Sequence, residues 1–485
     1  MAFPQADTKA ASALGAALRR VRYSEPAVLE MLGDDAYSHE RDDLPRDERR
    51  LAPTRLGTVV RALFLQLPVA RAELAGALGE RAVDALEAIG FAERADVYRP
   101  RARILPVGDL YVASDDYPSH DGEDPPDYVA AYTLTSRVCD CLTPRVRGGR
   151  VLDVGTGSGV QALLAARQAS KVVATDINPR ALAFTELNAA LNGFTNIEVR
   201  LGSLFEAVAG ERFDLITCNP PYVISPENRW AYRDSGLQGD EISRRVMLAA
   251  ADHLAEGGFV TMLASWLGAS EETADDRPVA WAKALTECDV WILSVWEADP
   301  LDHAATWNQQ LAGKREQFAD GLDRWTGYLA ELGVGWVSEG AILLHRRPGR
   351  RHGARVDGLD DESLESAGEQ VRRAFTGRAA LAELQRADDL LDTRPELAMR
   401  VELEQDVVPR RSGNAATGAR VQLVDGTSST VETTPAALDV LQRLDGTVKL
   451  RRLVGRATPS VRRDALHLCR ELLELGALEL RPRRR

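Results

Sequence analysis

The sequence of 485 residues lacks any long apolar run and any recognisable sorting signal. No stretch approaches the roughly 18 consecutive apolar residues that a membrane-spanning helix needs. The N-terminus has no basic start followed by an apolar core, and the alanine-rich stretch Ala10–Leu18 is too small and mixed for a signal peptide. With 45% hydrophobic and 27% charged residues, we expect a soluble chain of about three domains.

Cysteine is scarce, and no CxxC pair is present. An odd number of thiols without metal-ligand spacing indicates reduced cysteines, a cytoplasmic protein and no metal site. Cys139 and Cys141 are one residue apart, which favours a position on a helix over a metal pair. The cysteines are Cys139, Cys141, Cys218, Cys288 and Cys469.

An excess of positive charge is also missing, since the formal net charge is −13. This acidity argues mildly against an extensive nucleic-acid-binding surface, because phosphate binding needs local cations. The charge is uneven, however: residues 445–485 contain 11 Lys and Arg against 5 Asp and Glu and end in RPRRR. A basic C-terminal segment therefore keeps a nucleic-acid partner open.

Three glycines follow a short apolar run in the stretch VLDVGTGSG. The run Val151–Val154 predicts a strand, and QALLAARQA after the glycines predicts a helix. A strand, a glycine turn and a helix let the backbone approach a bound cofactor closely, because a Cβ would block that approach. Gly155, Gly157 and Gly159 are thus candidate cofactor-binding residues, although such a turn can also be purely structural.

A carboxylate stands at the end of the next predicted strand, Lys171–Thr175. Asp176 follows Gly155 by 21 residues, the spacing at which an acidic residue takes the ribose hydroxyls of an adenosine-containing ligand. Asn178 and the following proline predict a helix start, and Gly193 predicts its end. The alternative is a solvated loop carboxylate.

The motif NPPY follows a third predicted strand, Phe213–Cys218. Two prolines stiffen the loop and hold its carbonyls in place. The Asn219 side chain and the Pro220 main chain then offer two acceptors for the protons of a planar NH₂, and Tyr222 offers a ring face for stacking. The alternative, a simple proline turn, does not explain its place after a glycine turn and an acidic strand end.

These motifs resemble those of class I S-adenosylmethionine-dependent methyltransferases, in the branch that methylates planar nitrogens. DVGTGSG, ATDINP, CNPPYV and the pair Gly239-Asp240 are most similar to HemK/PrmC-type protein-glutamine methyltransferases and to related rRNA guanine-N2 methyltransferases. The likeness covers about Tyr111 to Arg347. One departure is Ser203, which stands where such proteins often have an acid that meets the adenine amino group.

The resemblance implies an α/β fold with a seven-stranded Rossmann-like sheet and S-adenosyl-L-methionine as cofactor. Its last strands are expected at Val290–Trp296 and Ala341–His345, with an unusually long insertion between them. The resemblance also implies that Asn219, Pro220 and Tyr222 carry catalysis. It implies cofactor contacts by Asp153, Gly155, Thr156, Gly157, Gly159, Asp176, Ile177, Ser203, Leu204 and Asn219.

We therefore expect an N-methyltransferase acting on a macromolecule of the translation apparatus, either a protein glutamine or an rRNA base. A ribosome-associated protein or nucleic acid is the expected partner, with no membrane and no metal. Two alternatives remain: a non-catalytic regulator built on a methyltransferase-like core, which the intact motifs disfavour, and a dehydrogenase, which NPPY disfavours.

Four segments are expected along the chain. Residues 1–107 form an N-terminal domain in which three helices and a hairpin over 91–105 suggest a winged helix. Residues 108–347 form the catalytic domain, and residues 348–368 read as a linker by composition. Residues 369–485 form a C-terminal domain that is also winged-helix-like. The tryptophans, all between Trp230 and Trp336, are expected mostly in the core.

Overall fold

The chain folds into two compact units in the computed structural model. The model describes residues 4, 7–115, 125–227, 233–234, 236–347, 352–360, 364, 367–410 and 413–481. Trp230 and the end of the basic tail, Arg483–Arg485, lie outside these ranges. Unit 1 comprises Met1–Cys139, Val146–Trp281 and Glu297–Glu339, and unit 2 comprises Asp140–Arg145, Ala282–Trp296 and Gly340–Arg485.

The chain begins with six helices and two small antiparallel strand pairs. Strand β1 pairs with β2, and β3 pairs with β4. The predicted hairpin over 91–105 is therefore wrong. Pro100 lacks a backbone donor, and the Arg101 amide bonds to the Phe91 carbonyl instead of a strand partner. The bounds are α1 Thr8–Arg20, α2 Glu25–Leu32, α3 Leu44–Arg50, α4 Arg55–Val59, β1 Val69–Ala70, α5 Arg71–Leu78, α6 Glu80–Ala88, β2 Val97–Tyr98, β3 Arg103–Val107 and β4 Leu110–Ser114.

Within unit 1, helix α1 packs directly on α9 (Pro179–Asn192). The Ser12 hydroxyl donates to the Ala190 carbonyl (3.1 Å). A Cβ at Gly15 would lie only 2.0 Å from the Leu191 carbonyl oxygen, so glycine permits this close approach. Residues expected to form a separate N-terminal domain thus share one hydrophobic core with the methyltransferase-like segment.

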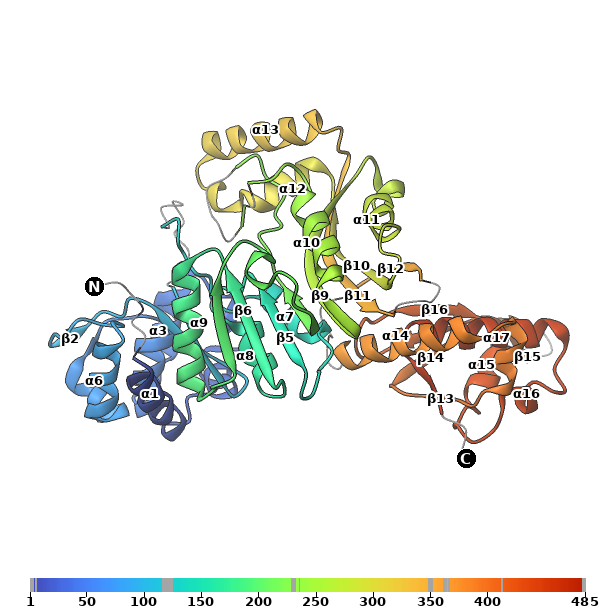
Figure 1. The fold of residues 1–485 in the computed structure, drawn as a ribbon, viewed down its shortest axis with the longest axis horizontal. Coiled ribbons are helices and arrows are strands. Elements are labelled where there is room, and N and C mark those ends of the chain that lie inside the picture. Colours follow the sequence, from blue (N-terminus) through green and yellow to red (C-terminus); the bar gives the residue numbers. More distant parts are fainter. Residues whose placement is uncertain are drawn as a thin grey trace. The chain divides into compact units, whose positions relative to one another are not determined.

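Five parallel strands of the sheet lie wholly in unit 1, in the order β9-β8-β5-β6-β7. Figure 1 labels β9, β5 and β6 of this group. The strand order runs outward from β5 to β6 and β7, then from β8 to β9. This reversal makes β5 and β8 the topological switch point of a doubly wound sheet. The bounds are α7 Leu134–Leu142, β5 Arg150–Val154, α8 Val160–Ala166, β6 Lys171–Asp176, β7 Ile197–Leu201, β8 Phe213–Cys218, α10 Glu241–Asp252 and β9 Leu254–Gly268.

Local signals place helix α9, as the sequence predicts. The Asn178 side chain accepts from the Arg180 amide (2.9 Å) at its start, and Pro179 takes the first helical position. Gly193 ends the helix with a left-handed φ of 78°. The capping residues at the two ends therefore account for where α9 begins and ends.

The long insertion expected before the last predicted strand is a pair of helices, α12 (Pro300–Trp307) and α13 (Arg315–Glu331). It follows α11 (Asp276–Ala282) and β10 (Cys288–Ala298) and precedes β11 (Trp336–Arg346). Asp299 caps α12 by accepting from the Leu301 amide (2.8 Å). The two insertion helices pack on each other and, with Glu297–Glu339, belong to unit 1.

Unit 2 contains a strand that the sequence analysis assigned to a linker. Strand β12 (Ala354–Gly358) runs parallel to β10, with Val290 opposite Ala354, and the predicted count of seven strands leaves it out. A long hairpin of β14 and β15 and the preceding helix α14 were also not predicted. The bounds are α14 Ala367–Glu383, β13 Pro395–Leu397, β14 Val401–Arg410, β15 Gly413–Leu423, β16 Thr430–Thr433, α15 Pro435–Leu441, α16 Leu450–Leu453, α17 Pro459–Glu474 and β17 Leu478–Leu480.

In the described part of the chain, no helix has both the length and the apolar character needed to cross a membrane. The same described residues contain no cluster of three or more His, Cys, Asp or Glu side chains able to hold a metal ion.

Candidate active site

Strand register brings the three motifs of the sequence to one edge of the sheet. Val154 at the end of β5 pairs with Thr175 of β6 on one side and with Cys218 of β8 on the other. Gly155 and Asn219 therefore leave neighbouring strands side by side, and Asp176 ends the strand next to them. Ligands of doubly wound sheets bind at this position, outside the carboxyl ends of the strands at the switch point.

The glycine turn leaves open space above β5. Gly155 and Gly157 have left-handed φ values of 67° and 55°, and a Cβ added at either would meet no atom within 4 Å. Gly159, with φ 83°, instead approaches α9 so closely that a Cβ would lie 2.9 Å from the Thr185 side chain. Two of the glycines thus face a space that a ligand can fill, and the third serves helix packing.

Asp176, at the end of β6, hydrogen-bonds to the backbone of the glycine turn. Its Oδ2 accepts from the Gly157 amide (2.9 Å), and its Oδ1 accepts from the Asn178 amide (2.8 Å). Burial raises the pKa of Asp176, although these backbone donors act in the opposite direction. The side chain remains partly exposed, and the adjacent Ile177 is 67% exposed. A carboxylate and an apolar side chain are thus available at the mouth of the turn.

Asp153 and Thr156 lie inside the protein instead. Asp153 is 2% exposed and accepts from the hydroxyls of Thr156 (2.6 Å) and Thr217 (2.9 Å) and from the Ala162 amide (3.2 Å). Burial raises the pKa of Asp153 to about 6. Because Thr217 is two residues before Asn219, this carboxyl group joins the strand of the glycine turn to the strand of the NPPY motif.

The loop after β7 places Ser203 and Leu204 beside Asp176. Leu201 pairs with Asp176 in the sheet, and the Gly202 amide donates to the Asp176 carbonyl (3.0 Å). Leu204 has a left-handed φ of 48°, a conformation that bulky residues rarely adopt. Ser203 is partly exposed, so its hydroxyl is available at the position where related proteins carry an acid.

The NPPY motif presents an amide at the switch point. Within the described ranges no group hydrogen-bonds the partly exposed Asn219 side chain, while Pro220 is buried. Burial raises the pKa of the Tyr222 phenol above its ordinary value. The motif thus combines an available amide with a protonated tyrosine.

The middle of the chain matches known methyltransferases. Residues 135–272 match the family model described as methyltransferase small domain. A putative protein N5-glutamine methyltransferase of Methanocaldococcus jannaschii is 37% identical over 136 residues, which cover 26% of this chain and 68% of that protein. The chain belongs to the class I S-adenosylmethionine-dependent N-methyltransferases. The sequence-based recognition of this family is confirmed.

Two further relatives have narrower matches. A release factor glutamine methyltransferase of Xylella fastidiosa is 36% identical over 129 residues, 24% of this chain and 47% of that protein. A ribosomal protein uL3 glutamine methyltransferase of Bradyrhizobium diazoefficiens is 33% identical over 146 residues, 27% of this chain and 46% of that protein. The chain spans about half the length of these two relatives. The family model includes the glycine turn, Asp176 and NPPY, but not the insertion helices.

In this methyltransferase, the insertion and strand β11 place two buried ionisable groups near the NPPY motif that the sequence did not single out. Glu339 of β11 accepts from the Trp307 indole (2.9 Å), and its charge opposes ionisation of Tyr222. Burial raises the pKa of Glu339 to about 7. His303 is fully buried, and burial lowers its pKa to about 4. Neither residue belongs to a motif; the only sequence signal is the abnormal length of the insertion.

We expect Glu339→Gln to change the pH dependence of stability. The raised pKa means that the folded protein binds the Glu339 proton more tightly than the unfolded chain, so wild-type stability falls as pH rises from about 5 to 8. The variant does not lose stability in this way. Between pH 5 and pH 8, the difference between the free energies of unfolding of variant and wild type should therefore change by roughly 3 kcal/mol in favour of the variant.

Urea denaturation at pH 5 and pH 8 measures that gap. Asp153 titrates in both proteins and cancels in the difference. Glu331→Gln, at an exposed position on α13, is the matched control and should show no pH-dependent gap. An equal gap at both pH values for Glu339→Gln would contradict the assignment of a proton to this carboxyl group.

Proposed function

We propose that this methyltransferase transfers a methyl group to the side-chain amide of a glutamine in a protein of the translation apparatus. The observation that carries the proposal is the Asn219 amide, available at the switch point and adjacent in the sheet to the open glycine turn. Such an acceptor would place the enzyme in the cytoplasm.

The residues at the strand ends fit S-adenosylmethionine. Gly155 and Gly157 face open space in which a Cβ would meet nothing, so a ligand can contact their backbone. The partly exposed Asp176 carboxylate suits the ribose hydroxyls, and Ile177 and Leu204 can cover the adenine, with Ser203 at its amino group. When bound, this cofactor supplies an activated methyl group on a sulfonium.

The acceptor nitrogen is a poor nucleophile because its lone pair is delocalised into the amide. Asn219 Oδ1 and the Pro220 carbonyl would accept hydrogen bonds from the two N–H groups of the acceptor amide. These bonds would favour a geometry in which the lone pair is free and would stabilise the positive charge that develops on nitrogen. The protonated Tyr222 would stack on the planar group. Positioning by the stiff Pro220-Pro221 segment supplies much of the remaining rate.

A protein acceptor is supported by two observations. The relatives are named for release factors and a ribosomal protein, and an acidic chain suits a basic, ribosome-associated partner. An rRNA base remains the second candidate because of the basic C-terminal segment. The described part of that segment is partly neutralised, since Arg481 donates to Glu396 (2.6 Å).

We also propose that the flanking segments recognise the acceptor as winged-helix-like modules around the seven-stranded catalytic core. The pairing of β1 with β2 around α5 and α6 supports this for the N-terminal segment. For the C-terminal segment, α15, α16 and α17 with the short pair of β13 and β17 support it. The boundaries proposed for these segments are 1–107, 108–347 and 369–485, with the first two packed around one shared core.

Transfer of a labelled methyl group tests the function. Purified release factors, ribosomal proteins and rRNA are incubated with the enzyme and labelled S-adenosylmethionine. We expect mass spectrometry to show a single glutamine whose mass has increased by one methyl group replacing hydrogen. Label in rRNA alone would contradict the protein acceptor.

Removal of Arg481–Arg485 tests independently whether the acceptor is a protein or an RNA. A protein acceptor predicts unchanged methylation and an unchanged salt dependence. An RNA acceptor predicts weaker binding and a salt dependence that is shallower by about one unit of slope for each phosphate that the removed arginines neutralise.

A further inference from the structure

We propose that the α12–α13 insertion positions the acceptor-binding NPPY loop, with Glu227 as the positioning residue that joins the two. The inference rests on the proposed function and deepens it, because it assigns the insertion to the acceptor side of the site. Neither the sequence motifs nor the match over 135–272 includes these helices.

The two residues directly after Tyr222 pack against the insertion helices. Val223 packs in one apolar cluster with Ala304 of α12 and Trp325 of α13. Ile224 packs in a second with Leu329 of α13. The two residues that follow the motif are thus each buried against an insertion helix.

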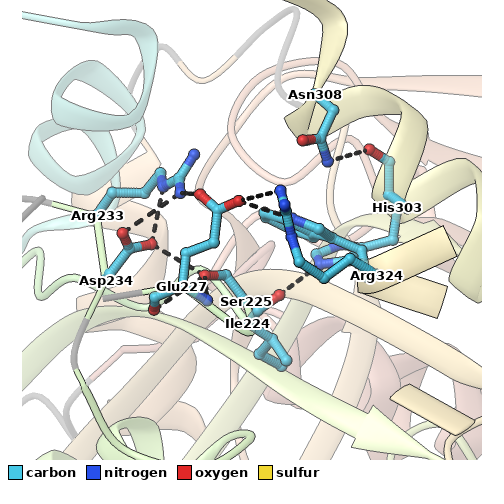
Figure 2. A network of polar contacts seen from close by, with 10 residues as sticks. Ile224, Ser225, Glu227, Arg233, Asp234, His303, Asn308 and Arg324 are labelled. Atoms are coloured by element: carbon cyan, nitrogen blue, oxygen red, sulfur yellow. Dashed lines mark hydrogen bonds and ion pairs between the residues drawn. The ribbon is translucent and has the colours of Figure 1, made fainter. Parts of the chain in front are cut away.

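A histidine fixes the backbone at the same point. His303 Nε2 lies 2.8 Å from the Ile224 carbonyl oxygen (Figure 2). A carbonyl only accepts, so Nε2 carries the proton. Because burial lowers the pKa of His303 to about 4, the ring is neutral at physiological pH and this hydrogen bond is constant.

Glu227 then joins the loop to α13. Its carboxylate accepts from Arg324 Nη2 (2.7 Å), from Arg233 Nη2 (2.9 Å) and from the Trp325 indole (3.4 Å) (Figure 2). We call Glu227, Arg233, Arg324 and Trp325 the Glu227 junction. It takes donors from both the loop and the helix, so neither can shift without the other.

The loop side of the Glu227 junction is buried, whereas Arg324 on α13 is 54% exposed. The Arg233 side chain is 7% exposed, and Asp234, at 0%, pairs with it at 2.8 Å. Asp234 also accepts from the Ser225 hydroxyl (3.1 Å), and the Arg233 guanidinium lies 5.6 Å from the Trp325 ring centre. The buried Arg233–Asp234 pair holds a fixed geometry, whereas the exposed Glu227–Arg324 pair is screened by water. The link to α13 therefore also depends on the Trp325 indole and on the apolar contacts of Val223 and Ile224.

The location predicts which step depends on the Glu227 junction. Pro220 and Pro221 transmit a displacement of Val223–Glu227 to the acceptor oxygens of Asn219 and Pro220, because their φ angles are fixed. The proposed cofactor residues follow β5, β6 and β7, which lie on the other side of the switch point from β8 and β9. Loss of the junction should therefore affect methyl transfer and not cofactor affinity.

Glu227→Gln tests the proposal, with Glu331→Gln on the exposed side of α13 as the matched control. We expect kcat to fall by at least about tenfold through misplacement of the acceptor, with the affinity for S-adenosylhomocysteine unchanged. Amide hydrogen exchange over 219–227 should become faster in the variant. The control should match the wild type in all three measurements.

Two results would overturn the proposal. One is an unchanged kcat and exchange rate in Glu227→Gln. The other is a parallel fall of kcat and cofactor affinity, which indicates a general loss of folding. If wild-type enzyme methylates no glutamine, the proposed function fails, and the exchange rate at 219–227 alone decides whether Glu227 positions the loop.

Discussion

Asn219→Ala should abolish detectable methyl transfer while leaving cofactor affinity within about threefold of the wild type. Asn219 lies at the acceptor side of the switch point, and its amide makes no bond within the described structure that the substitution would break. Loss of one aligned acceptor costs about 100- to 1,000-fold in kcat in comparable sites. Single-turnover kinetics and calorimetry with S-adenosylhomocysteine measure the two quantities separately.

Asn219→Asp is the matched variant for this prediction. It keeps an acceptor oxygen at the same position, so part of the activity should remain. Transfer at the wild-type rate by Asn219→Ala would show that the acceptor is not a planar NH₂ and would remove the proposed mechanism.

Asp176→Ala should weaken binding of S-adenosylhomocysteine at least tenfold, or about 1.4 kcal/mol. The substitution removes the carboxylate that we propose binds the ribose and also frees the Gly157 and Asn178 amides that this carboxylate holds. Both losses act in the same direction. Calorimetry gives the affinity, and the thermal midpoint without ligand shows whether the turn itself has loosened.

Glu198→Ala is the control for Asp176, because it removes a carboxylate from the neighbouring strand β7 where Glu198 pairs with Arg200 and Lys171. Its cofactor affinity should equal that of the wild type. Equal affinities for wild type and Asp176→Ala would exclude Asp176 from the cofactor site.

The catalytic centre could be predicted from the sequence because its geometry follows from local rules. The strand Phe213–Cys218 has the predicted bounds, and Asn178 and Gly193 cap α9 as expected. Parallel strands then bring their carboxyl ends to one edge regardless of what surrounds them. The roles of Asn219 and Asp176 in binding and catalysis remain predictions.

Long-range packing explains the features that the sequence did not reveal. Asp153 is expected to contact the cofactor, yet its oxygens are used by Thr156 and Thr217, since Thr217 comes close only when β5 pairs with β8. His303 reaches the NPPY loop through an insertion that carries no motif, and Glu339 of β11 bonds to Trp307 of that insertion. Strand β12 lies in a stretch whose Gly- and Arg-rich composition is typical of a linker.

The packing of α1 on α9 has a consequence for synthesis on the ribosome. The Ser12 hydroxyl and its Ala190 partner are 178 residues apart in the chain. The face of α1 that carries Ser12 and Gly15 therefore emerges long before α9, although α6, which also packs on α1, follows much sooner. Until α9 is translated, the nascent chain exposes the α9-facing surface, and association with chaperones is expected during that interval.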